Sequence, residues 1–157
     1  MASGPVATGY HAAPPAMDAA SSLHVPGSEE GQGAARAGFD AFLAAHRLPP
    51  GSTWRFQVAL DEVLSNIVKY ARTAGGEPAR VELRIRLLED SLEVVVIDDA
   101  VAFNPLEAPR PDVTQPVETR KVGGLGVALV KKLMDAVEYE RRDDRNRLLL
   151  RRRLGAS

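Results

Sequence analysis

The stretch FQVALDEVLSNIVKYA, from Phe56 to Ala71, has the spacing of a helix with one side in a protein core. Its apolar residues recur every three or four positions: Phe56, Leu60, Val63, Leu64, Ile67, Val68 and Ala71. Another side of the same helix carries Glu62 and, one turn later, Asn66. Most polar positions on amphipathic helices simply face water. A carboxylate stacked over a carboxamide can also act on a ligand, and the rest of the chain bears on that choice.

The composition is that of a globular protein. The chain has 157 residues, of which 45% are hydrophobic, and a net charge of −1, which fits one domain with its own core. Cysteine is absent, which excludes disulfides, thiolate nucleophiles and cysteine-based zinc sites. The net charge and the aromatic content of 5% favour neither nucleic acid nor an anionic membrane. Because no apolar run approaches a membrane span and the first residues do not resemble a secretory signal, we expect a cytoplasmic protein.

The first part of the chain predicts a leader followed by a strand and a helix. Residues 1–20 are rich in alanine, glycine and proline without periodicity, which predicts a disordered leader before a domain over residues 21–157. Residues 21–26 fit a short edge strand that Pro26 ends. Ser28 is the expected N-cap of the next helix. Ser52 or Thr53 is the expected N-cap of the central helix.

The second half predicts two hairpins separated by a long loop and a helix. The hairpins span residues 80–99 and 137–154. Residues 100–122 hold four prolines and little periodicity, and a loop of this length in a small domain is usually functional. The following helix has these apolar residues on its expected inner face: Leu129, Val130, Leu133 and Met134. Hairpins joined by helices predict an α/β fold, a two-layer sandwich of a mixed β-sheet with helices on one face.

Three motifs suggest one site. Gly123, Gly124 and Gly126 lie at a helix start, where free backbone N–H groups and the helix dipole can meet a phosphate. Asp98 and its neighbour Asp99 end a strand, where a carboxylate can accept a hydrogen bond from an exocyclic amine such as that of adenine. Each motif has an ordinary alternative, a glycine that ends a loop or a charged strand end.

The third motif is the pair on the central helix. Asn66 offers a neutral oxygen suited to a magnesium ion that already holds phosphates and water. Glu62 can accept a proton from a water or hydroxyl that attacks a γ-phosphate. Together the three motifs describe a site for a nucleotide and magnesium.

The motifs resemble those of a known superfamily. EVLSN (62–66) resembles the N box, DDAVAFNP (98–105) the first Gly box and GGLGVALV (123–130) the second. Their order is that of the ATPase superfamily of gyrase, histidine kinases and the heat-shock and mismatch-repair ATPases. The short form, with FNPL after the aspartates and KKLMDAVEYERRDDRNRLLL near the end, is most similar to bacterial anti-sigma-factor serine kinases. The resemblance covers about residues 21–154.

The resemblance implies the histidine-kinase-like ATPase fold, a site and two cofactors, ATP and Mg²⁺. Glu62 matches the catalytic base, Asn66 the magnesium ligand and Asp98 the adenine-binding aspartate. Residues 106–122 match the lid. The implied nucleotide contacts are Asn66, Asp98, Phe103, Gly123, Gly124, Leu125 and Gly126.

The resemblance also implies a function. Members phosphorylate a serine on a STAS-domain anti-anti-sigma partner, and usually hold a sigma factor inactive as a homodimer. The first helix has more small apolar residues than one face needs, which is consistent with a dimer contact: Ala34, Ala35, Ala37, Ala41, Ala44 and Ala45. No direct contact with nucleic acid or a membrane is implied.

Some positions depart from the superfamily pattern. Ala100 and Ala102 stand where the first Gly box usually has permissive residues, Tyr70 stands where many relatives have histidine, and Leu149 replaces a threonine near the adenine. Ala100, Ala102 and Leu149 favour an alternative function, a non-catalytic, nucleotide-sensing adaptor that sequesters a sigma factor or STAS protein; the intact Glu62 favours the kinase.

Two further classes are disfavoured. A full histidine kinase would need a preceding helix pair with a phosphoacceptor histidine, which this chain has no room for. The arginines of the last hairpin are partly offset by acidic residues and lack interleaved aromatic residues, which argues against a nucleic-acid surface.

Overall fold

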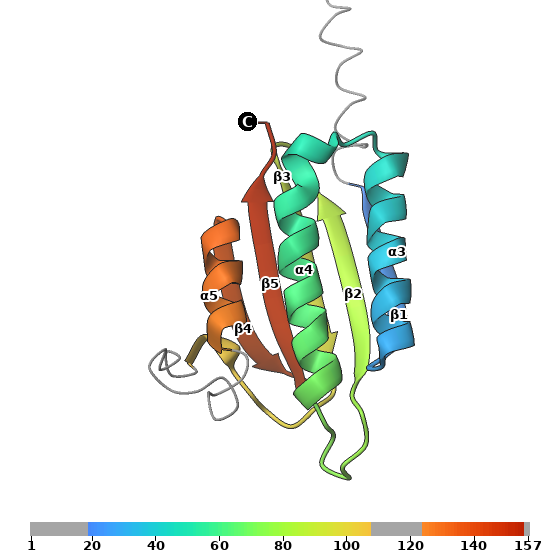
Figure 1. Ribbon diagram of the computed structural model, residues 1–157, viewed down its shortest axis with the longest axis vertical. Helices are drawn as coiled ribbons and strands as arrows, with labels where there is room; N and C mark the ends of the chain where they lie inside the picture. The colour runs from blue at the N-terminus through green and yellow to red at the C-terminus, as the bar shows by residue number, and fades with distance from the viewer. Residues whose placement is uncertain (1–18, 108–123, 156–157) are drawn as a thin grey trace, which may run out of the picture.

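The computed structural model describes residues 19–107 and 124–155. It has two layers, a five-stranded sheet and three helices that lie across one face of it (Figure 1). The strand order is β1-β2-β3-β5-β4. The strands are β1 (Ala20–Pro26), β2 (Arg80–Leu87), β3 (Ser91–Asp98), β4 (Ala136–Arg142) and β5 (Arg145–Arg153), and the helices are α3 (Glu29–Ala45), α4 (Pro50–Tyr70), α5 (Gly124–Leu133) and the short 3-10 turn η1 (Pro105–Glu107).

The predicted two-layer α/β sandwich is confirmed, but its sheet pairs differently from the expected mixed sheet. All four pairings between the described strands are antiparallel. The reason lies in the last hairpin: β3 and β4 run in the same direction, as expected for strands joined through a helix, but β5 returns between them. Parallel strands are therefore present and never adjacent.

Serine and proline determine where the two long helices begin. Ser28 caps α3 as predicted, because its Oγ accepts a hydrogen bond from the backbone N–H of Gly31. The predicted cap of α4 was wrong: the N-cap is Pro49 and the helix begins at Pro50, whose fixed φ suits the first helical position. Ser52 and Thr53 lie in the first turn, and their hydroxyls donate to the carbonyl oxygen of Pro49.

The helix α4 is the centre of the helical layer, between α3 and α5 (Figure 1). The first half of its predicted apolar stripe is buried in the core: Phe56, Leu60, Val63 and Leu64. Phe56 packs against Phe39 of α3 with ring centroids 6.1 Å apart. The second half, from Ile67 to Ala71, is only half-buried, because there α4 borders a cavity rather than the sheet.

The helix α5 packs less deeply than its sequence predicted. Val130 and, just past its end, Met134 are buried as expected, whereas Leu129 is 39% exposed and its predicted inward orientation was wrong. The helix α5 has ten residues. Only a narrow apolar stripe of it packs on the core, and Leu129 lies beside that stripe.

The last hairpin turns more tightly than DDRN suggested. Asp143 and Asp144 have φ of 53° and 59°, as in a two-residue turn with both central residues left-handed. Asn146 therefore belongs to β5 and pairs with Asp98. Among the described residues, none of the helices is long and apolar enough to span a membrane.

Candidate active site

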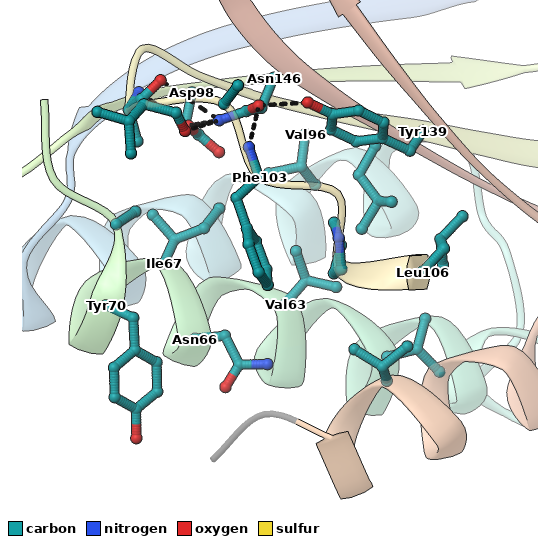
Figure 2. Close-up of a pocket in the computed structure, with 18 of the residues that line it drawn as sticks. Val63, Asn66, Ile67, Tyr70, Val96, Asp98, Phe103, Leu106, Tyr139 and Asn146 are labelled. Atoms are coloured by element: carbon teal, nitrogen blue, oxygen red, sulfur yellow. Dashed lines mark hydrogen bonds between the residues drawn. The ribbon is translucent and has the colours of Figure 1, made fainter. Parts of the chain in front are cut away.

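A cavity of about 500 Å³ lies between the C-terminal half of α4, the start of α5 and the segment that follows β3. Most of its lining is apolar, with Asn66, Asp98 and Asn146 among its polar residues (Figure 2). Mostly apolar cavities with a few convergent polar groups are the usual form of small-molecule sites. The fold thus brings Asn66 and Asp98, from two of the three predicted motifs, to one cavity, together with Val127 and Val130 from the end of the third.

The predicted catalytic base contacts the glycine-rich helix start. Gly126 lies in the first turn of α5, and a Cβ built there would be 2.3 Å from Oε2 of Glu62 and 2.8 Å from its Cγ and Cδ. Glycine at position 126 leaves room for the Glu62 side chain in its present rotamer, which a Cβ would displace. Its role here is close approach, not an unusual backbone angle.

Glu62 also faces outward. It borders an open groove between α3 and α4, together with Gln32, Arg36, Asp61 and Ser65. Its carboxylate thus stands between the start of α5 on one side and a solvent-open surface on the other. A proton acceptor in this position can reach a group that arrives from solvent.

The remaining phosphate-site residues are placed only in part. Gly124, Leu125 and Gly126 form the first turn of α5, where backbone N–H groups lack intrahelical partners. Gly123 lies outside the described residues, as do residues 108–123, which include most of the predicted lid, and residues 1–18 of the predicted leader.

Asn66 lines the cavity beside apolar side chains such as Val63 and Val127. A neutral oxygen in such a setting suits Mg²⁺, which keeps phosphate oxygens and waters as its other ligands. The described part of the chain contains no group of three or more His, Cys, Asp or Glu side chains that could hold a metal by itself. A single neutral oxygen such as that of Asn66 would hold the ion together with the phosphate oxygens of a bound nucleotide.

Asp98 ends β3 at the base of the cavity and is 9% exposed. Its Oδ1 accepts hydrogen bonds from Nδ2 of Asn146 and from the backbone N–H of Ala100, both at 2.9 Å. Burial raises the pKa of Asp98; the two hydrogen bonds and nearby Arg141 act in the opposite direction, and Asp99 adds to the rise.

Phe103 reaches from the segment after β3 toward α4 in Figure 2. Its side chain is largely solvent-exposed, at 61%, although it lines the cavity. Its backbone N–H donates to Oδ1 of Asn146 at 3.1 Å. An exposed aromatic ring over a cavity can stack on a planar ligand, which is consistent with the predicted nucleotide contact.

Asn146 was missed in the sequence and stands at the centre of the polar end of the cavity. It is 7% exposed and bonds to Asp98, Phe103 and Tyr139. The signal available was the DD turn: a two-residue turn places Asn146 second in β5, on the inward side of the strand, since Leu148 and Leu150 follow at the period of two.

The alternation of side chains between the two sheet faces along β5 also corrects one predicted departure from the superfamily pattern, the one at Leu149. Leu148 lines the cavity, so Leu149 points to the opposite sheet face and does not occupy the position near the ligand. The match of Leu149 to a threonine near the adenine, which the resemblance implied, is therefore wrong, because a shift of one residue along a strand reverses the face of the side chain.

The other departures cause no backbone strain. Among the described residues other than glycine, only Arg47, Asp143 and Asp144 have positive φ, so Ala100 and Ala102 adopt angles that any residue tolerates. Both line the cavity. Tyr70 lies at the rim and is 48% exposed.

The raised pKa of Asp98 gives a testable pH dependence. The ionised carboxylate accepts a hydrogen bond from an amine and the neutral acid does so poorly, so nucleotide affinity should fall as the pH drops through a pKa above the ordinary 3.8. Titration calorimetry with ATP at several pH values measures this, and Asp98→Asn should remove the dependence. A raised carboxyl pKa in the folded state makes this group favour folding more at low pH, so loss of fold through Asp98 cannot imitate the effect. Constant affinity across the acid range would contradict the assignment.

Comparison with known proteins defines the class of this fold and site. Residues 25–152 match the family described as the histidine kinase-like ATPase domain, and the chain belongs to this family. A solved structure of the RsbU and RsbW domains of a Mycobacterium tuberculosis protein shares the fold, with a TM-score of 0.60 and 12% identity over 87% of this chain and 32% of that one.

Within the family, the chain is similar to named serine kinases. It is 35% identical over 98 residues to the serine/threonine-protein kinase BtrW of Bordetella bronchiseptica. The matched region covers 61% of this chain and 68% of BtrW. It is 34% identical over 89 residues to the serine-protein kinase RsbW of Halalkalibacterium halodurans, covering 54% of this chain and 52% of that RsbW. The chain spans about half the length of the RsbW relatives it matches. The predicted resemblance to this branch of serine kinases is confirmed.

Proposed function

We propose that this protein is an ATP-dependent protein-serine kinase that phosphorylates a STAS-domain partner and acts as an anti-sigma regulator in a partner switch. The observation that carries the proposal is the contact between Glu62 and Gly126, which puts a proton acceptor against the first turn of a helix that can bind phosphate. The relatives named serine-protein kinases support it.

The residues divide the work between the two ends of the cavity. Asp98 accepts a hydrogen bond from the adenine amine, and Phe103 covers the base. The first turn of α5 binds the phosphates through backbone N–H groups. Asn66 would hold Mg²⁺, which neutralises charge on the phosphates as the transfer proceeds.

Glu62 serves the transfer itself. The hydroxyl oxygen of a serine on the partner forms a bond to the γ-phosphorus of ATP, and the bond from that phosphorus to the bridging oxygen breaks, releasing ADP. The serine proton passes to Glu62. The open groove between α3 and α4 gives the partner's serine a way to approach this carboxylate from solvent.

A homodimer is part of the proposal. Strand β1 is at the edge of the sheet, and α3 beside it exposes five alanines to solvent, Ala34, Ala37, Ala41, Ala44 and Ala45. An unpaired edge and small side chains allow close approach of a second copy. Sedimentation at tens of micromolar should give twice the 16.9 kDa of one chain; a single-chain mass would contradict the dimer.

The proposal is tested by incubating the protein and Mg-ATP with STAS proteins from the same genome. A mass increase of one phosphate on one serine of one candidate is the expected result, with Glu62→Gln as the control that transfers far less. Binding of a STAS protein or sigma factor without any mass increase, unchanged by Glu62→Gln, would instead show the adaptor that senses nucleotide without chemistry.

A further inference from the structure

Asn146 connects three separate segments around the polar end of the cavity (Figure 2). Its Oδ1 accepts from the backbone N–H of Phe103 at 3.1 Å, the hydroxyl of Tyr139 at 2.6 Å and the guanidinium of Arg141 at 3.2 Å. Its Nδ2 donates to Oδ1 of Asp98 at 2.9 Å and to the backbone carbonyls of Val101 at 3.0 Å and Ala100 at 3.4 Å.

The orientation of this amide is determined by its partners. The backbone N–H of Phe103 and the guanidinium of Arg141 can only donate, so they must face the carbonyl oxygen of Asn146. The backbone oxygens of Ala100 and Val101 can only accept, so they must face its NH₂ group. Asn146 therefore always presents a donor to Asp98.

This orientation determines which oxygen of Asp98 remains for a ligand. Asn146 and the backbone N–H of Ala100 both bind Oδ1. Oδ2 accepts no hydrogen bond from the residues that the structure describes. A buried carboxylate oxygen of this kind needs a donor, and a ligand amine in the cavity supplies one.

Asn146 also holds the segment that carries Phe103. This segment, residues 100–103, is bound to Asn146 at three backbone atoms. Arg141 adds a bond of 2.9 Å to the carbonyl oxygen of Ala100. The Phe103 ring is mostly exposed, so the backbone bonds rather than packing keep it over the cavity.

We propose that Asn146 is a positioning residue of the nucleotide site. It orients Asp98 so that one carboxylate oxygen faces the base, and it holds residues 100–103 so that Phe103 lies over the cavity before nucleotide binds. The inference rests on the proposed ATP binding. Its consequence is selectivity for a base with an amine: a base with a carbonyl in that place would put two acceptors together.

The first test needs no nucleotide. Amide hydrogen exchange of the ligand-free protein should show roughly tenfold faster exchange at Phe103 in Asn146→Ala, because the hydrogen bond that protects the Phe103 amide is lost. Asn104→Ala is the matched control, since Asn104 directly follows this segment and, within the described part of the chain, its side chain accepts only from the nearby backbone N–H of Leu106. Tyr139→Phe removes one donor to Asn146 with little change in shape and should give a smaller increase. Equal exchange at Phe103 in Asn146→Ala and Asn104→Ala would overturn the inference.

The second test measures selectivity with ATP and inosine triphosphate, which has a carbonyl in place of the amine. Wild type should prefer ATP. Asn146→Ala should weaken the binding of ATP about 10- to 100-fold and the binding of inosine triphosphate much less, so the preference for ATP becomes smaller. Asn146→Asp keeps the shape of the side chain but presents an oxygen to Asp98, and it should also reduce the preference for ATP. Equal loss of both nucleotides in the folded variants would overturn the positioning role. Failure of wild type to bind ATP would overturn the proposed function instead, and the exchange result would still stand.

Discussion

Glu62→Gln should bind Mg-ATP nearly as well as wild type and transfer phosphate about 10²–10⁴-fold more slowly, the usual contribution of a positioned general base. Glutamine keeps the length of the side chain that fits against Gly126, so the site keeps its shape. What it loses is the ability to accept the serine proton. Phosphoryl transfer through a loose transition state depends little on a base, so the lower end of the range is expected.

The measurements are nucleotide affinity by calorimetry and the rate of phosphate transfer to a STAS partner. Glu89→Gln is the matched control, because Glu89 is an exposed carboxylate between β2 and β3, at the end of the sheet away from Asp98. That variant should transfer at the wild-type rate. Asn66→Ala should behave differently from both and weaken Mg-ATP binding and transfer together. A Glu62→Gln protein with full transfer would remove Glu62 from the mechanism.

The motifs could be predicted from sequence because they are local. The spacing from Phe56 to Leu64 determined which side of α4 enters the core, and that in turn left Glu62 and Asn66 on a side available to a ligand. The position of Asp98 at a strand end followed from the apolar run before it. Such features depend on periods of 3.6 and 2 residues and need no knowledge of the partner elements.

The predictions that were wrong or missing depend on how helices and strands pack against one another. Asn146 and Leu149 could be assigned to a sheet face only after the turn at Asp143 and Asp144 was known to have two residues, because a shift of one residue reverses every side chain in a strand. The contact of Glu62 with Gly126 joins residues from α4 and α5. Glycine at a helix start predicts room for a phosphate, and the pattern alone does not show that the same glycine makes room for a side chain.

That contact leads to the second large effect. Gly126→Ala should lose transfer activity to about the extent of Glu62→Gln while its free energy of unfolding stays equal or rises by up to about 1 kcal/mol. Alanine is the better helix former. Its Cβ, however, would lie within 2.8 Å of Cγ of Glu62 as well as of the terminal carboxylate, so rotation of the carboxylate alone does not relieve the overlap. The whole side chain must take another rotamer and leave the helix start.

The matched control is Gly51→Ala, because Gly51 is exposed in the first turn of α4 and a Cβ there meets nothing within 4 Å. It should gain helix stability with no loss of transfer. If Gly126 acts through Glu62, the double variant Glu62→Gln/Gly126→Ala should be no slower than the slower single variant, since residues that act as a unit are not additive. The measurements are denaturant unfolding and transfer rates for wild type, Glu62→Gln, Gly126→Ala and the double variant. Multiplied losses in the double variant, or full activity in Gly126→Ala, would show that the two residues act separately and that the contact between α4 and α5 does not place the base.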